Sequence, residues 1–483
     1  MADWKEQLKL ALDGVVSGGN FAVTGTVDGP LPEVAVRGVG KLALPIDADQ
    51  ANDLIFAGLP APYGKGAKTV LDPAVRKATQ FEADRVRFSD DWDATIRRVA
   101  TGAATALGVS GGGASVEAHL YKLLVYEPGG HFTAHRDTEK EPGMFGTLLV
   151  QLPVAGGHTG GELSISHQQG REEFWDTEAA AAAAAGAPAA GGGNSGATGA
   201  PAGGFQQQQQ PVLQYAAFYA DCEHELSQVK SGLRVVLAYN LVRVQQAAVV
   251  AAAAATTAAA SGDAAAASIA GPPTANSSAP SSASAVTEAV RAWEAAASSA
   301  GAGAAVQPLV TLLLAHRYTE TNLDFGMLKG DDAAKVQALL ECPLLDVHLV
   351  LFTKEVSGRA DMYCSDGDPE EDLEYAQEMA GMDEEYFCET EVKAWVSPLF
   401  GRLRHVGGKD ALGLKLEELE DSLLGGEQVF PDDLTPDMRM YVPHTGNEGP
   451  DITYWYHRAL AVVWPRSRRP MLPAAVQGCL TSA

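Results

Sequence analysis

The sequence predicts an α+β protein with two folded units, the first made of supporting helices followed by a β-sandwich or barrel. Of its 483 residues, 46% are hydrophobic and 20% are charged, which is the composition of chains that bury a core. Short β-rich runs separated by glycine-rich turns follow a helical lead-in. A stretch from residue 246 to about 306, rich in Ala and Ser, divides this unit from a C-terminal one.

The expected elements follow this order along the chain. Residues 1–115 form a lead-in of helices and strands that supports the domain, and residues 116–245 form the β-rich core. Helices are predicted at 4–15 and at 90–107, the second with Ser89 as a cap candidate. Strands are predicted near 116–126, 146–152, 161–167, 212–220 and 232–242. In the C-terminal unit, 307–483, we expect a helix near 331–342 and strands near 346–353 and 453–464.

Three stretches have compositions that do not predict a packed core. Residues 179–210 contain an Ala run, a Gly/Ala/Pro run and five glutamines, and are expected to be a loop insertion. Residues 246–306 are expected to be a disordered linker, because small side chains bury too little surface to offset the entropy of ordering. The acidic stretch 366–391 is expected to be a solvated loop.

Charge and cysteine content exclude several classes of protein. The formal net charge is −26 and the isoelectric point is about 4.7, which disfavours a nucleic-acid partner held by a broad basic face. No membrane span and no secretory signal are predicted, so we expect a cytoplasmic or nuclear protein without a membrane partner. Five widely spaced cysteines without a C-x-x-C pair predict neither a disulfide framework nor a structural zinc site.

The stretch from Tyr126 to Asp137 contains the residues that best predict chemistry. His135 is the only histidine with an acidic residue two positions on, and residues so spaced on an extended strand point to the same side. Fe(II) accepts two imidazoles and one carboxylate on one face and keeps open positions on the other. His224, in a later predicted strand, is the candidate for the second imidazole. The alternative is a surface pair of His135 and Asp137 without a metal.

Arg234 begins another apolar strand ten residues after His224. A guanidinium at the start of a buried strand needs an anion, and its planar fork fits a carboxylate. A dicarboxylate bound at one end to iron and at the other to Arg234 meets both requirements. The alternative is a structural ion pair with Glu223 or Glu225, and Lys230 is the next candidate if Arg234 fails. Cys222 is expected to be a packed small hydrophobe rather than a catalytic thiol.

In this arrangement the chain resembles the iron(II)/2-oxoglutarate-dependent dioxygenases of the prolyl 4-hydroxylase type. The resemblance covers about residues 116–242 and includes the Gly-Gly-Glu that precedes the second histidine. The matching residues are Tyr126, Gly129, Phe132, His135, Asp137, Gly160, Gly161, Glu162, His224, Gly232 and Arg234. Gly446-Asn447-Glu448-Gly449 and Tyr456-His457-Arg458 are similar to a poorly characterised eukaryotic two-part group.

The resemblance implies a double-stranded β-helix (jelly roll) with N-terminal helical support. It implies Fe(II) bound by His135, Asp137 and His224, and 2-oxoglutarate bound by Arg234, with ascorbate as a further cofactor. Tyr126 would contact the co-substrate near the metal, and Thr147 and Gln151 would help to hold its distal carboxylate. Many relatives have Tyr in place of Phe132 and near Gln151, so the co-substrate contacts differ in detail.

The activity implied is decarboxylation of 2-oxoglutarate to succinate and carbon dioxide, coupled to hydroxylation of an unactivated C–H bond. The substrate implied is a peptidyl side chain, with a small molecule as the other option. The loop from Arg136 to Phe145 mixes acids and bases, which favours a neutral or basic peptide. The rival function is a catalytically idle scaffold that binds proteins through its acidic C-terminal domain. That domain is predicted to be either a degenerate jelly roll or an unrelated α+β fold, without a second iron site.

Overall fold

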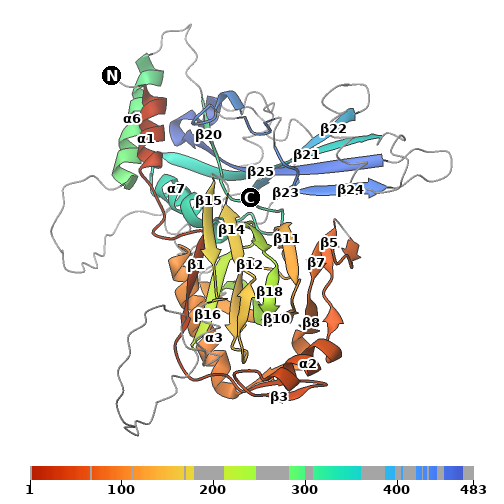
Figure 1. Cartoon of the computed structure of the whole chain (residues 1–483). Helices are drawn as coiled ribbons and strands as arrows, with labels where there is room; N and C mark the ends of the chain where they lie inside the picture. The colour runs from red at the N-terminus through yellow and green to blue at the C-terminus, as the bar shows by residue number, and fades with distance from the viewer. Residues whose placement is uncertain are drawn as a thin grey trace, which may run out of the picture. The chain divides into compact units, whose positions relative to one another are not determined.

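The computed structural model describes most of the two predicted units (Figure 1). The described residues are 3–65, 68–109, 114–167, 170–178, 212–245, 282–299, 308–359, 387–397, 404–405, 420–426, 428–431, 434–442 and 451–471. One compact unit comprises Gly18–Ala251, and the other combines Met1–Ser17 with Ala252–Ala483. The insertion at 179–210 and residues 246–281 and 300–306 of the predicted linker lie outside the described residues. Among the helices described, none has the length and apolar composition needed to cross a membrane.

A seven-stranded antiparallel sheet forms the larger half of the unit 18–251. Its strand order is β1-β16-β12-β19-β10-β8-β4, and residues far apart in sequence are therefore neighbours in it. The strands are β1 Ala22–Val27, β4 Leu59–Pro60, β8 Thr79–Glu82, β10 Ala114–Tyr126, β12 Met144–Leu152, β16 Leu213–Tyr219 and β19 Arg234–Gln245. The predicted core strands are all present, with ends shifted by a few residues.

A five-stranded antiparallel sheet has the order β15-β14-β17-β11-β7. Its strands are β7 Arg76–Lys77, β11 His131–His135, β14 Leu163–His167, β15 Arg171–Trp175 and β17 Glu223–Leu226. A separate two-stranded sheet pairs β13 His158–Gly160 with β18 Val229–Gly232. The chain passes back and forth between these sheets from β10 to β19, so each sheet contains strands from the beginning and the end of the core.

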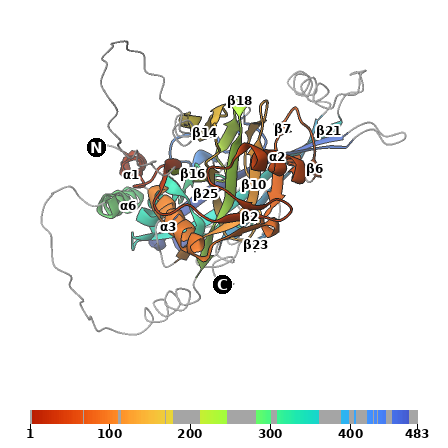
Figure 2. The same cartoon turned by 60° about the horizontal axis from the view of Figure 1, so that its bottom comes forward.

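Helix α3, Asp90–Ala106, packs beside the seven-stranded sheet (Figure 2). Three aspartates occupy its first turn, where the helix dipole favours negative charge. Trp92 on its buried stripe donates from Nε1 to the hydroxyl of Tyr239 on β19, at 2.9 Å. The hydroxyl of Tyr219 on β16 donates to the carbonyl of Leu107 just beyond the helix. The predicted helix 90–107 therefore buttresses the outer side of this sheet.

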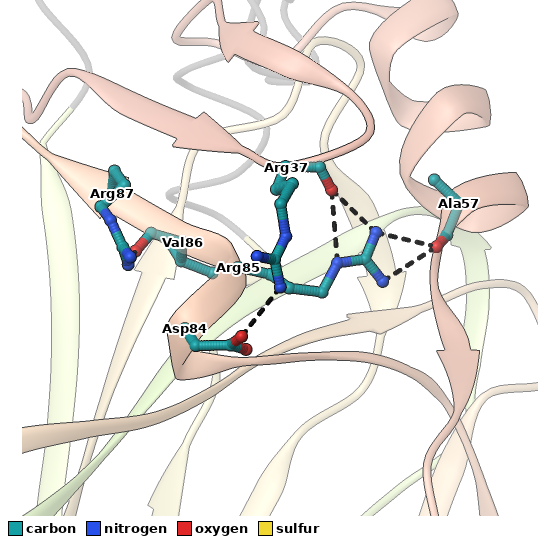
Figure 3. Close-up of polar contacts among 6 residues, drawn as sticks. All are labelled: Arg37, Ala57, Asp84, Arg85, Val86 and Arg87. Carbon is teal, nitrogen blue, oxygen red and sulfur yellow. Dashed lines mark hydrogen bonds and ion pairs between the residues drawn. The ribbon is translucent and has the colours of Figure 1, made fainter.

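Smaller elements complete the support of this unit. A three-stranded sheet joins β2 Val34–Val36, β3 Gly40–Leu42 and β9 Val86–Phe88, and a two-stranded one joins β5 Tyr63–Lys65 to β6 Lys68–Val70. Arg85, at the end of the short 3-10 helix η1 Ala83–Arg85, ties helix α2, Ala48–Ala57, to this region (Figure 3). Its guanidinium donates to the carbonyl of Ala57 at 3.2 Å and to that of Arg37 at 2.8 Å. The side chain thus satisfies a terminal helix carbonyl that has no partner inside the helix.

Among its described residues, the second unit contains an antiparallel sheet and three α-helices. Strands β20 to β23 and β25 follow the order β20-β25-β21-β22-β23, and β24 also pairs with β25. The strands are β20 Val310–Leu313, β21 Leu345–Arg359, β22 Phe387–Ser397, β23 Arg404–His405, β24 Met438–Val442 and β25 Asp451–Pro465. The helices are α1 Trp4–Asp13, α6 Ser282–Ser299 and α7 Gly330–Leu340, with 3-10 helices η2 Phe325–Met327 and η3 Arg466–Met471. The described strands form a single sheet, so an α+β unit is seen, but not the second sheet of a degenerate jelly roll.

Two boundaries of the predicted organisation are wrong. Helix α6 lies inside the stretch expected to be a disordered linker, and it buries Val286, Ala289, Val290 and Trp293. That spacing is one apolar helical stripe, which supplies the buried surface that the composition concealed. Helix α1 packs on α6, with the rings of Trp4 and Trp293 stacked at 4.5 Å, so it belongs to the C-terminal unit. Strand β22 also begins within the acidic stretch 366–391, which is therefore not entirely loop.

Candidate active site

A cavity of about 90 Å³ lies between the two main sheets of the unit 18–251. Tyr126, Thr147 and Arg234 line it from the seven-stranded sheet, and His135 and His224 line it from the five-stranded sheet. One water needs about 10–15 Å³ by this measure, so the space holds about six or more waters or a small ligand. The winding of the chain between the sheets brings residues from distant parts of the sequence to one place.

The three residues expected to bind iron lie together in this cavity. Strands β11 and β17 are paired so that His135 is directly opposite His224. Asp137 follows the end of β11, and its backbone N–H donates to the carbonyl of Ala220 at 3.1 Å. One ligand atom from each of the three side chains lies within 4.8 Å of the other two. Such a cluster matches the two imidazoles and one carboxylate of a mononuclear Fe(II) site.

Backbone carbonyls orient both imidazoles. Nδ1 of His135 lies 2.8 Å from the carbonyl of Thr133, and Nδ1 of His224 lies 3.2 Å from that of Cys222. A carbonyl only accepts hydrogen bonds, so each Nδ1 carries the proton and each Nε2 presents its lone pair. Metal-binding histidines commonly have their second nitrogen fixed in this way. His224 Nε2 lies 3.9 Å from Oδ2 of Asp137.

The ionisation states also suit a metal. Burial, together with the nearby His224, lowers the pKa of His135 to about 3, so this imidazole is neutral at physiological pH. Burial alone would raise the pKa of Asp137, but the two imidazoles and a hydrogen bond from Thr147 hold it below its ordinary value. Thr147 Oγ1 donates that bond at 2.5 Å to Oδ2. A neutral imidazole and an ionised carboxylate are the forms that bind metals.

Arg234 is a buried cation without an anion. Its side chain is 2% exposed, and its Nε and Nη2 atoms have no acceptor. Burial lowers its pKa to about 10, so the guanidinium stays protonated at neutral pH. The alternative ion pair is not formed, because Glu223 pairs with Arg136 at 3.1 Å and no described carboxylate pairs with Arg234. An unpaired buried charge is costly, so this group predicts a bound anion.

The glycine two residues before Arg234 is required by the backbone. Gly232 ends β18 with φ +74°, a conformation that side chains disfavour. A Cβ atom there would lie 2.1 Å from the carbonyl oxygen of Gly157. The Gly-x-Arg spacing of the sequence thus reflects a tight turn that starts strand β19 at Arg234.

One expected co-substrate residue lies elsewhere. Gln151 does not line the cavity; its Nε2 is 3.0 Å from Nε2 of His158, and its Oε1 accepts from Thr177 at 2.7 Å. His158 had the sequence context of a surface residue, yet it is 4% exposed, and burial followed by the charge of Arg234 lowers its pKa. Its glycine-rich sequence context is typical of a surface loop and did not predict that His158 is buried. Nδ1 and Nε2 of His131 lie 3.1 and 2.8 Å from the carbonyls of Gly129 and Ala74, so the ring faces backbone groups and is not part of the metal cluster.

Three further residues that the sequence did not single out also line the cavity: Arg76, Tyr121 and Lys140. Phe132, at the position where many relatives have Tyr, stacks on the ring of His135 with centroids 3.5 Å apart. Cys222 is fully buried, as a packed small side chain would be. The cavity therefore combines the predicted residues with a second set of polar side chains.

No protein-family model and no curated protein sequence matches this chain. Among solved structures, a prolyl-4-hydroxylase from Pseudomonas putida is similar at 13% identity and a TM-score of 0.26, over 49% of this chain and 99% of that one. A prolyl hydroxylase from Trichoplax adhaerens, in complex with a hypoxia-inducible-factor peptide fragment, is similar at 12% identity and 0.27, over 49% and 88%. An oxidoreductase of the 2OG-Fe(II) oxygenase family from Burkholderia pseudomallei is similar at 14% identity and 0.22, over 41% and 80%.

Proposed function

We propose that this chain is an Fe(II)- and 2-oxoglutarate-dependent dioxygenase that hydroxylates an unactivated C–H bond. The observation that carries the proposal is the cavity that contains both an oriented His-Asp-His cluster and a buried, unpaired guanidinium. A metal alone would explain the first feature, and an anion alone would explain the second. A dicarboxylate co-substrate that binds the metal at one end and Arg234 at the other explains both.

The fold supports this reading. From β10 to β19 the chain crosses repeatedly between the two main antiparallel sheets, which is the winding expected of a double-stranded β-helix. In such a fold the two sheets enclose one site, and here the cavity is lined from both. Helix α3 packs on the seven-stranded sheet and provides the helical support that was predicted from the sequence.

Each residue has a defined role in the proposal. His135, Asp137 and His224 would hold iron on one face and leave the other positions open. When bound, Fe(II) supplies dioxygen activation for oxidation of 2-oxoglutarate and of the substrate C–H bond. Arg234 would bind the distal carboxylate, and Tyr126 would contact the co-substrate near the metal.

Two roles change from those that the motif suggests. Thr147 donates to Asp137, so we assign it to holding the metal-binding carboxylate rather than the distal end of the co-substrate. Gln151 sits in the buried network with His158 and Thr177, next to Arg234. In the proposal, this network of side chains holds the surroundings of Arg234 in place.

The substrate class follows from charge and resemblance. A peptidyl side chain, as in prolyl hydroxylases, or a small molecule fits a protein with net charge −26 better than a nucleic acid does. An idle scaffold is the rival, but in a scaffold the buried Arg234 would have no anion, and only its contact with the Trp175 ring, 5.0 Å from Cζ, would offset the lost hydration.

The test is succinate formation from 2-oxoglutarate by the purified full chain with Fe(II) and air. We expect slow turnover without a prime substrate, and its loss in His135→Ala, Asp137→Ala and His224→Ala, because two remaining ligands hold iron poorly. His131→Ala is the matched control, since the ring nitrogens of His131 face the carbonyls of Gly129 and Ala74 and not the cluster, and it should retain turnover. Wild-type rates in any of the three would remove that residue from the site, and no succinate from the wild type would contradict the function.

A further inference from the structure

Arg76, Tyr121 and Lys140 line the cavity and have no part in the proposed metal and co-substrate sites. Two of them are cations in a protein with a net charge of −26. Their surroundings indicate what part of a substrate they would contact.

Arg76 lies beside the metal cluster. It pairs with Phe132 across strands β7 and β11, and its Cζ lies 4.4 Å from the centroid of the Phe132 ring. Phe132 in turn stacks on the ring of His135, so Arg76, Phe132 and His135 form a row of contacting side chains. Nη1 of Arg76 donates to the carbonyl of Pro62 at 2.8 Å, whereas its buried Nε has no acceptor. The guanidinium is therefore fixed near the metal with donor capacity to spare.

Tyr121 and Lys140 lie close to one another at the same cavity. The pairing of β10 with β19 shifts register between Leu120 and Lys122, which leaves Tyr121 as the extra residue of a bulge. Bulges redirect side chains and are common next to active sites. Nζ of Lys140 lies 5.9 Å from the Tyr121 ring centroid, and its hydrogen bond is to Thr138 Oγ1 at 2.6 Å.

The carboxylates around these residues are already engaged. Glu82 pairs with Lys122 at 3.6 Å, and Glu223 pairs with Arg136 at 3.1 Å. Glu141, next to Lys140, binds both His119 and the side-chain amide of Asn240 at 2.7 Å. Within the part of the chain that the structure describes, no carboxylate forms an ion pair with Arg76 or Lys140. Among the residues that line the cavity, Arg76, Lys140 and Arg234 are cationic and Asp137 is acidic, so the lining has a net positive charge although the protein is acidic.

We propose that Arg76 and Lys140 bind a carboxylate of the prime substrate, with Tyr121 lying against the same group. The proposal rests on the proposed function and narrows its substrate class. It replaces the preference for a neutral or basic peptide that the loop from Arg136 to Phe145 suggested. Glu141 of that loop is already bound to His119 and Asn240 and is not available to a basic substrate. The carboxylate belongs either to an acidic side chain near the oxidised residue of a peptide or to a free carboxylic acid.

The experiment compares matched acid and amide probes with the full chain, Fe(II), 2-oxoglutarate and air. The peptide probes are capped proline peptides that carry Asp or Asn at successive spacings from the proline. The small probes are N-acetylproline and N-acetylglutamate with their amides. The rate of succinate formation, and a gain of one oxygen atom in the probe, are measured. The acid member should change the rate, up or down, at about 10-fold lower concentration than its amide.

Charge reversal tests the assignment to these residues. Arg76→Glu and Lys140→Glu should each abolish the preference for the acid member and favour peptides with Lys at the same position. Among the described contacts, the Lys140 side chain makes one hydrogen bond, to Thr138 Oγ1, and is exposed, so its variant should retain the fold even if Arg76→Glu does not. Arg97→Glu, an exposed residue on α3, carries the same charge change away from the cavity and should keep the preference.

The outcomes separate the sources and the hypotheses. A response to Asp peptides identifies a peptide substrate, and a response to the free acids alone identifies a small molecule. Equal potency of acid and amide, no response to either, or a preference that survives both reversals would overturn the proposal. Absence of succinate before any probe is added would instead refute the proposed function.

Discussion

Two buried ionisable side chains, one in each unit, differ in how their hydrogen-bonding groups are satisfied. Asp332 on α7 is 3% exposed and accepts hydrogen bonds from the backbone of Ala315 and His316, at 2.8 and 2.9 Å, and from the hydroxyl of Tyr318 at 3.1 Å. Arg234 on β19 is 2% exposed and leaves two nitrogens without an acceptor. Both side chains are buried, but only the first has its hydrogen-bonding groups satisfied by its own chain.

This difference distinguishes an ionisable side chain that stabilises the fold from one that is placed to bind a ligand. Buried polar groups in folded proteins are nearly always hydrogen-bonded, so an exception calls for an explanation. Asp332 organises the loop from Ala315 to Tyr318 and needs no ligand. Arg234 points into a cavity beside an oriented His-Asp-His cluster, so a ligand is the missing partner. Removing the two side chains should therefore have opposite consequences.

The largest effect is expected at Arg234. Arg234→Leu should weaken 2-oxoglutarate binding by about 3–5 kcal/mol, several hundred-fold or more, because it removes one partner of a buried charge pair. Isothermal titration of the metal-loaded protein measures this. Lys230→Leu, an exposed cation on β18, is the control and should bind normally. Normal binding by Arg234→Leu together with weak binding by Lys230→Leu would transfer the role to Lys230.

Stability gives the second half of the comparison. Without ligand, Arg234→Leu should not lower the melting temperature, because an unpaired buried charge is replaced by an apolar side chain. Asp332→Ala should lower the free energy of unfolding by about 3 kcal/mol, since it removes the acceptor of two buried donors and one part-buried donor, at about 1–3 kcal/mol for each buried one. Denaturant titration of both variants checks this. A destabilised Arg234→Leu with an unaffected Asp332→Ala would invert the account.

The partly exposed pair of His119 and Glu141 should have a much smaller effect on stability. Burial alone would lower the pKa of His119, but its hydrogen bonds and charge interactions with Glu141 and Glu117 raise it above its ordinary value. The stabilisation is thus present below the ordinary pKa and is lost as pH rises through the raised one. Because these side chains are partly exposed, we expect less than about 1 kcal/mol. His119→Gln should flatten this part of the stability profile, and an unchanged slope would show that the pair contributes nothing.

The predicted metal ligands lie together in the structure, whereas the predicted boundaries of the units are shifted. Short-range spacing placed His135 and Asp137 on one strand end, and the structure brings His224 opposite to them. Long-range packing was beyond reach, because Trp4 stacks on a tryptophan of α6 far along the chain. The helix itself was hidden by an Ala- and Ser-rich composition in which one apolar stripe determines the fold.

The residues missed at the cavity have physical reasons of their own. Tyr121 enters it through a bulge, and a one-residue register shift leaves no trace in an alternating pattern. Arg76 reaches it through pairing of the two-residue strand β7, which is too short for a periodic signal. Gln151 was placed at the co-substrate by analogy, and a buried His158 engages it instead. Motif spacing specified ligand types, while tertiary contacts decided which neighbours complete the site.

The most direct test of the central claim is the visible absorption of the protein with Fe(II) and 2-oxoglutarate in the absence of oxygen. If the His-Asp-His cluster and Arg234 form one site, adding 2-oxoglutarate should produce a weak metal-to-ligand charge-transfer band. The band should be absent in His224→Ala and should need several hundred-fold more 2-oxoglutarate in Arg234→Leu. A wild-type protein without the band, or a His224→Ala protein with it, would contradict the account.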